Sequence, residues 1–106
     1  FHNWAFNVNR GWDIAQKWEK IPQDTDILIT HGPLFGILDL TNRNEVVGCQ
    51  DLYNKVMEIK PKVHACGHIH HSYAMKEMDG MTFINASSLG EDYLYQNDPI
   101  TLDFDF

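Results

Sequence analysis

The chain has little positive charge. Of its 106 residues, 8 are Lys or Arg and 15 are Asp or Glu, which gives a formal net charge of -7 at pH 7. The basic residues are scattered along the sequence and form no basic stripe. A protein that holds nucleic acid by its phosphates needs clustered positive charge, so we do not expect nucleic acid as a partner.

Long apolar runs are also absent. No run approaches the roughly 20 residues of a membrane-spanning helix, and no signal-peptide pattern is visible. We therefore expect a cytoplasmic protein with no membrane contact. The composition, 43% hydrophobic and 22% charged without a low-complexity tract, is typical of one folded domain. Because the chain begins with Phe1 and not with Met, we expect it to be part of a longer protein.

Cysteine is scarce, and the two cysteines are Cys49 and Cys66. Their number and spacing match no standard metal-binding or disulfide framework. We expect two reduced, partly buried thiols, as is usual in the cytosol, and a disulfide between them is the alternative.

Histidine, in contrast, is concentrated. The chain has six histidines, and three of them, His68, His70 and His71, lie within the stretch "CGHIHHSYA". Another, His31, directly follows the apolar run in "ILITHGPLFG". Both groups therefore come immediately after short apolar segments that have the composition of buried strands.

The apolar spacing predicts an alternation of helices and strands. In chain order, the predicted elements are a helix over Gly11–Ile21, a strand in "DTDILIT" buried on both faces, a loop over Gly32–Gly48, a helix over Gln50–Ile59, a strand in "KVHAC", a hairpin of "SYAMKEM" and "MTFINA", and a half-buried strand in "ITLDFDF". The hairpin turn is expected at Asp79-Gly80, because both residues tolerate positive φ.

The strand-helix-strand order between Thr25 and Cys66 predicts a right-handed crossover that joins two parallel strands. Parallel strands end at the same edge of a sheet, which is where open α/β sheets build their sites. We therefore expect His31 and His68 to converge in space. If the chain after Gly67 is extended, alternate side chains face the same way, so His70 should share the side of His68, and His71 should point away.

Neutral imidazoles are good ligands for zinc, manganese and iron. We therefore interpret His31, His68 and His70 as candidate metal ligands. An alternative is a structural zinc site that joins Cys66 to His68 and His70, although its spacing is not a standard structural pattern.

The other three histidines receive the ordinary interpretation of surface residues or satisfied core residues. They are His2, His64 and His71. His64 lies inside a predicted strand, where one hydrogen bond would satisfy its ring.

Four further residues are candidate substrate contacts: Trp4, Asn7, Arg10 and Asn85. An aromatic ring that stacks on a base, with an arginine on a phosphate, would suit a nucleotide. Two alternatives stay open. The aromatic residue near the start suits a buried cluster, and Asn85 suits a turn held by side-chain hydrogen bonds.

The segments "ILITHGP", "VHACGHIHHSY" and "FINASS" resemble the C-terminal half of the calcineurin-like metallophosphoesterases, in particular the branch of metallophosphoesterase-domain-containing proteins and Icc-like phosphohydrolases. The segment "WAFN" with Arg10 resembles the same branch, so the resemblance covers nearly the whole chain. It implies an α/β fold, the C-terminal half of a four-layer α/β/β/α sandwich with a mixed sheet. Residues 1–106 would form one C-terminal portion of that domain, with the N-terminal half absent.

The resemblance also implies roles for the histidines. It makes His31 and His68 ligands of one metal and His70 a ligand of another, with two divalent ions of Mn, Fe or Zn as cofactors. The family's motifs D-x-H, G-D-x-x-D and G-N-H-E do not occur in this chain. The other ligands, and the histidine that serves as general acid, are therefore expected in the N-terminal half.

The function that the resemblance implies is metal-dependent hydrolysis of phosphomonoesters or phosphodiesters, with cyclic nucleotides among the candidates. The alternative is a non-catalytic metallophosphoesterase-like scaffold for protein partners, and a small zinc-binding module is a third option. The presence of all three histidine ligands favours the enzyme. Because half of the sheet and site would be missing, we expect the isolated chain to be inactive and to self-associate or await its other half.

Overall fold

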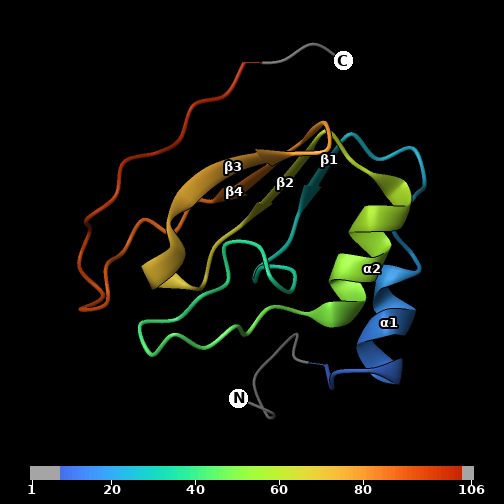
Figure 1. Cartoon of the computed structure of the whole chain (residues 1–106), viewed down its shortest axis with the longest axis horizontal. Coiled ribbons are helices and arrows are strands. Elements are labelled where there is room, and N and C mark those ends of the chain that lie inside the picture. Colours follow the sequence, from blue (N-terminus) through green and yellow to red (C-terminus); the bar gives the residue numbers. More distant parts are fainter. Residues whose placement is uncertain (1–7, 104–106) are drawn as a thin grey trace.

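The computed structural model describes residues 8–103 and places a mixed four-stranded sheet beside two helices (Figure 1). The helices are α1 (Trp12–Trp18) and α2 (Gln50–Ile59), and the strands are β1 (Ile27–Ile29), β2 (Val63–Cys66), β3 (Ala74–Met78) and β4 (Met81–Asn85). A single 3-10 turn, η1 (His70–Ser72), precedes β3. None of the helices in the described part has the length and hydrophobicity of a membrane-spanning segment.

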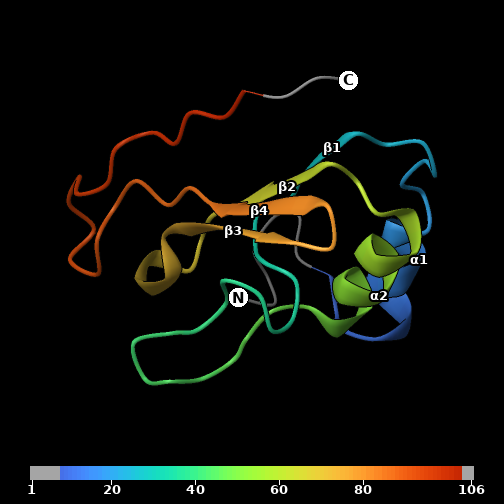
Figure 2. The ribbon, with the colours of Figure 1, turned by 45° about the horizontal axis from the view of Figure 1, so that its top comes forward.

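The strands lie in the order β1-β2-β4-β3. The strand β2 is parallel to both β1 and β4, and β3 is antiparallel to β4. The predicted parallel pairing across the crossover and the predicted mixed α/β sheet are therefore confirmed. The four-layer sandwich of the complete domain stays a prediction, because residues 8–103 form this one sheet with helices at one side of it (Figure 2).

Helix α2 packs on the sheet through one apolar face. Leu52 and Val56, four residues apart, are 1% and 0% exposed and belong to the same buried cluster as Phe83 of β4. The helix ends where Lys60 adopts a left-handed conformation with φ 48° and is followed by Pro61. Its bounds are those predicted from the sequence.

Helix α1 is shorter than the predicted range of Gly11–Ile21. After Trp18, the backbone N–H groups of Lys20 and Ile21 bond to carbonyls three residues earlier, at 3.1 and 3.0 Å, which is the tighter 3-10 pattern. The chain thus leaves the helix through a 3-10 turn before Pro22, and the prediction was wrong by about one turn at this end.

The hairpin of β3 and β4 confirms the predicted turn. Asp79 and Gly80 both have positive φ, at 53° and 79°, and the flanking Met78 and Met81 pair across the turn. Two consecutive residues of positive φ match the right-handed twist of the two strands.

Two predicted strands differ from the structure. The strand β1 was expected to be buried on both faces, but Ile27 is 41% and Ile29 is 75% exposed. It lies at the end of the sheet, and only Leu28 packs against the core cluster. The segment "ITLDFDF" forms no strand at residues 100–103, and residues 104–106 lie outside the described part. Alternation predicts which side of a strand is buried, but strand formation also needs a free partner edge.

The loop that links β1 to α2 contains no helix or named strand between Gly32 and Gly48, as predicted. A buried carboxylate organises it. One oxygen of Asp39, a residue 3% exposed, accepts hydrogen bonds from the N–H groups of Gly36 and Gly48, each at 2.8 Å. A side chain at Gly48 would overlap the carbonyl of Leu34, so the loop closes tightly on itself.

The substitution Asp39→Ala should destabilise the chain strongly, because it leaves two N–H groups in the loop without their acceptor. We expect the free energy of unfolding to fall by about 2–4 kcal/mol in urea denaturation. The matched control is Glu45→Ala, which removes an exposed carboxylate from the same loop. Equal effects of the two substitutions would show that the hydrogen bonds of Asp39 to Gly36 and Gly48 contribute nothing to stability.

Candidate metal centre

Two histidines meet where β1 and β2 end. The hydrogen-bond ladder continues past both strands, because the N–H of Thr30 bonds to the carbonyl of Ala65 at 3.0 Å and the N–H of Gly67 bonds to that of His31 at 2.9 Å. The ring centroids of His31 and His68 lie 4.6 Å apart, with their planes tilted by 45°. The predicted convergence of these two histidines is therefore confirmed.

The chain turns sharply at His68. This residue has a φ of 70°, in the left-handed region that side chains other than glycine rarely adopt. The N–H of Ile69 bonds back to the carbonyl of Gly67 at 2.8 Å, and η1 follows directly. The predicted extended conformation after Gly67 was therefore wrong. Backbone strain of this kind clusters at functional sites.

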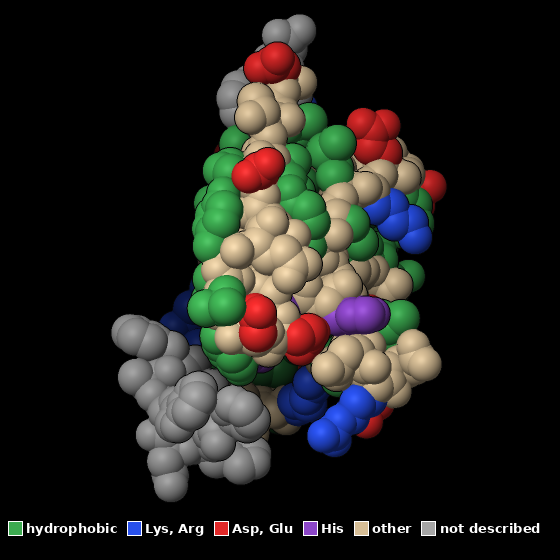
Figure 3. All heavy atoms as spheres, turned by 90° about the vertical axis from the view of Figure 1, so that its left-hand side faces the viewer, with side chains coloured by type: hydrophobic (Ala, Val, Ile, Leu, Met, Phe, Trp, Pro, Cys, Tyr) green, Lys and Arg blue, Asp and Glu red, His purple; other side chains and the backbone are tan. Residues whose placement is uncertain are grey.

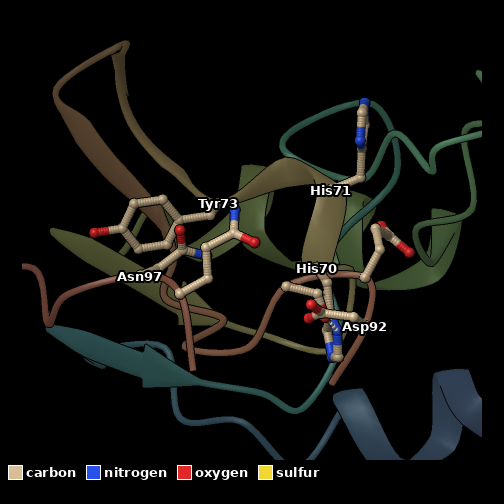
Figure 4. A pocket seen from close by; sticks show the side chains of 8 residues that line it. His70, His71, Tyr73, Asp92 and Asn97 are labelled. Carbon is tan, nitrogen blue, oxygen red and sulfur yellow. Dashed lines mark hydrogen bonds between the residues drawn. The ribbon is translucent and has the colours of Figure 1, made fainter. Parts of the chain in front are cut away.

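His70 is oriented by a backbone carbonyl. Its Nδ1 lies 2.9 Å from the oxygen of Gly90, and since a carbonyl only accepts, Nδ1 carries the proton. The lone pair is then on Nε2. Histidines that bind metals commonly donate their other N–H to a carbonyl or carboxylate in this way. Figure 4 shows the rings of His70 and His71 pointing in different directions, although both line the same hollow.

The electrostatics favour a neutral imidazole at His68. Burial lowers its pKa, and the nearby rings of His31 and His70 lower it further. Metals bind the unprotonated ring, so these neighbours make His68 available as a ligand down to a lower pH than an isolated histidine.

The imidazole nitrogens are donors of the kind that a transition metal binds, but too few of them lie together to form a complete site. Within residues 8–103, no three His, Cys, Asp or Glu side chains come close enough together to hold an ion. The pair His31 and His68 offers two nitrogen donors, and His70 offers one more. Zinc sites use three or four protein ligands, so a complete centre would need ligands from outside the described residues.

Sequence reasoning missed the support beneath His31. The hydroxyl of Thr30 donates to the carbonyl of Gly32 at 2.6 Å, so its oxygen accepts from Nε2 of His64 at 2.9 Å. His64 is 2% exposed and packs edge-on to Phe83, with ring centroids 6.2 Å apart. The interpretation of His64 as a satisfied core residue is confirmed. The position of Thr30 directly before His31 was the one signal in the sequence for this support.

Asn85 is buried within the protein. It is 0% exposed, and its amide nitrogen donates to the carbonyls of Leu38 at 3.2 Å and Ile69 at 2.9 Å. Its side-chain oxygen accepts from the N–H of Ser87 at 3.1 Å and from the hydroxyl of the same serine at 2.8 Å. The alternative of a turn held by side-chain hydrogen bonds therefore describes Asn85, which ties the long loop to the turn at His68.

Arg10 is exposed and reaches the end of the same loop. Its two terminal nitrogens donate to the carbonyls of Val47 at 2.7 Å and Gly48 at 3.0 Å. A guanidinium can donate five such bonds, and within residues 8–103 these two are the bonds of Arg10. The other two candidate substrate contacts, Trp4 and Asn7, lie outside the described residues.

Both cysteines are free, which confirms the prediction of reduced thiols over a disulfide. Burial raises the pKa of Cys66 to about 12, with a further contribution from Asp39. Within residues 8–103, Cys66 belongs to no group of three side chains that could hold an ion, which weighs against the alternative structural zinc site.

Comparisons with known proteins identify relatives of this chain. Metallophosphoesterase domain-containing protein 1 of Homo sapiens is 41% identical over 105 residues, which cover 97% of this chain and 32% of that protein. Two UPF0046 proteins of Caenorhabditis elegans are 41% and 38% identical over 103 and 95 residues, which cover 95% and 90% of this chain and 26% and 32% of those proteins.

The chain is therefore similar to one part of proteins of the metallophosphoesterase branch. It spans about a third or less of the length of these relatives. No family model matches the sequence.

The substitution His64→Phe should flatten the dependence of stability on pH. Burial lowers the pKa of His64 from 6.5 to about 4, so the folded chain resists a proton that the unfolded chain accepts. The contribution of His64 to stability is therefore fully present above pH 6.5, and about 3 kcal/mol of it is lost as the pH drops to about 4.

We expect urea denaturation across this range to show a smaller loss for His64→Phe than for the unsubstituted chain. The exposed His71→Phe serves as the control, with a profile parallel to that of the unsubstituted chain. If His64→Phe also gave a parallel profile, the buried ring would not be the source of the pH dependence.

Proposed function

We propose that the complete protein that carries this chain is a metal-dependent phosphoesterase, in which His31 and His68 bind one divalent ion and His70 binds a second. The observation that carries the proposal is the 4.6 Å approach of His31 and His68 at the shared end of two parallel strands. The names of the relatives support the same superfamily. The substrates in view are phosphomonoesters and phosphodiesters, with cyclic nucleotides among the candidates.

Two ions of Mn, Fe or Zn would supply the positive charge that polarises a phosphoester and lowers the pKa of a bound water. The residues of this chain would hold and orient that charge. Imidazoles bind without adding negative charge, so His31, His68 and His70 leave an ion strongly electrophilic. The bond of His70 to Gly90 fixes the orientation of its ring, and the bond of His64 to Thr30 holds the residue that precedes His31.

The remaining ligands and the general acid would come from the rest of the protein. Arg10, whose guanidinium suits a phosphate, is a candidate contact for that group. Free thiols at Cys49 and Cys66 fit a reducing compartment, so we propose a cytoplasmic location.

Metal binding tests the assignment of ligands. In the complete protein, we expect two Mn²⁺ per chain by isothermal titration calorimetry. His31→Ala, His68→Ala and their double variant should each bind one fewer ion, because both rings serve the same ion. His70→Ala should lose the other ion instead.

The matched control is His71→Ala, which lies beside His70 but points in a different direction and should keep both ions (Figure 4). Unchanged metal content in the other variants would contradict the proposed ligands.

The exposed edge of the sheet leads to a proposal about partners. Within residues 8–103, β1 is the last strand of the sheet, and it exposes Ile27 and Ile29. An unpaired edge strand pairs readily with another strand. We propose that another segment of the complete protein covers this edge. In its absence, a second copy of the chain would take that place.

Light scattering of the isolated 106-residue chain should therefore show a species larger than a monomer and no phosphatase activity. Ile29→Lys should shift it toward a monomer, since a charge on the strand opposes edge pairing. Met75→Lys on the other edge strand, β3, is the control and should leave the association unchanged. A well-behaved monomer with phosphatase activity would contradict the proposal.

A further inference from the structure

Three hollows in the described part of the chain differ in charge. The hollow beyond His70, of about 430 Å³, includes Glu91 and Asp92 in its wall. Figure 4 shows Asp92 beside His70, and Figure 3 shows acidic side chains spread over this face, with Lys and Arg side chains toward its margins. The hollow between α1 and α2 includes three carboxylates, of Glu19, Asp51 and Glu58, and one ammonium group, of Lys55, which pairs with two of them. Neither is suited to a dianion such as a phosphate monoester.

The third hollow lies beside the histidine pair and has the opposite character. This cleft, of about 320 Å³, includes both His31 and His68 in its wall. None of the described residues that line it is acidic, and Arg10 is at its rim. In a chain with 15 acidic and 8 basic residues, this combination gives the cleft a local charge that attracts anions.

The rest of the cleft wall is largely apolar. Ile14 and Trp18 of α1 and Val47 at the end of the long loop line the cleft. The indole N–H of Trp18 bonds to the sulfur of Cys49 at 3.4 Å, which holds the ring in place. A flat apolar group in this cleft would lose water on several sides while its anionic end remained at the histidines.

We infer that this cleft binds the organic group of the substrate, and that this group is a single aromatic or similarly flat apolar ring joined to the phosphate. The inference rests on the proposed function, because it places the phosphate at His31 and His68. A volume at the lower end of ligand pockets suits one ring better than a large polar group. Ile14 and Trp18 are then specificity determinants, and Arg10 contributes charge at the rim.

Two stable phosphonates separate binding from the chemistry of bond cleavage. Phenylphosphonate and methylphosphonate have the same anionic group, and only phenylphosphonate has a ring. In the complete protein with Mn²⁺, isothermal titration calorimetry should show phenylphosphonate binding at least about tenfold more tightly, as burial of a ring predicts.

The substitution Ile14→Trp fills the cleft and should bring the two dissociation constants within about twofold of each other. Gln16→Trp places the same side chain on the exposed side of α1 and should keep the preference. Ile14 is only partly buried, so we expect Ile14→Trp to fold, and a thermal melt that matches that of the unsubstituted protein checks this. Arg10→Gln should weaken both phosphonates by similar factors, because it acts on the shared anion.

Equal binding of the two phosphonates, or a preference that survives Ile14→Trp, would overturn the inference. Hydrolysis of p-nitrophenyl phosphate by the same preparation reports on the proposed function separately. Hydrolysis without a preference for the ring contradicts only the inference that the cleft binds a ring. A preference for the ring without hydrolysis contradicts the phosphoesterase function and supports the binding of a ring in the cleft. If neither binding nor hydrolysis is seen, both the phosphoesterase function and the binding of a ring in the cleft are contradicted.

Discussion

The parallel pairing of β1 with β2 is the constraint on which the rest of this structure depends. Each strand is only three or four residues long, yet the ladder continues through Thr30 and Gly67 and thereby fixes the two segments that follow. The separation of His31 from His68 is set by the spacing of neighbouring strands and needs no flexible side chain to close it. A site built in this way is rigid, and rigid placement is what a metal requires of its ligands.

A buried polar network transmits that rigidity to the surrounding loops. Asp39 holds the long loop closed, Asn85 ties this loop to the turn at His68, and His64 supports the segment of His31 from below. None of the buried side-chain nitrogen and oxygen atoms in the described part of the chain lacks a partner. Fully satisfied networks of this kind specify one arrangement, because any alternative leaves a buried polar group unpaired.

Local sequence signals predicted much of this fold and the approach of His31 to His68. The apolar spacing gave the bounds of α2, and Asp79-Gly80 predicted the hairpin, because both depend on neighbouring residues. The exposure of β1 and the absence of a strand at residues 100–103 depend on which partners lie nearby, which no local pattern records. The same holds for Thr30, whose role arises from a contact with His64, a residue distant in the sequence.

The central claim is that His31 and His68 share one metal ion while His70 serves another. Anomalous diffraction from crystals of the complete protein grown with Mn²⁺ tests it most directly. The account predicts one anomalous peak within about 2.0–2.3 Å of ring nitrogens of both His31 and His68, and a second peak at Nε2 of His70. A peak that involves only one histidine of the pair, or a single peak bound by all three, would contradict it.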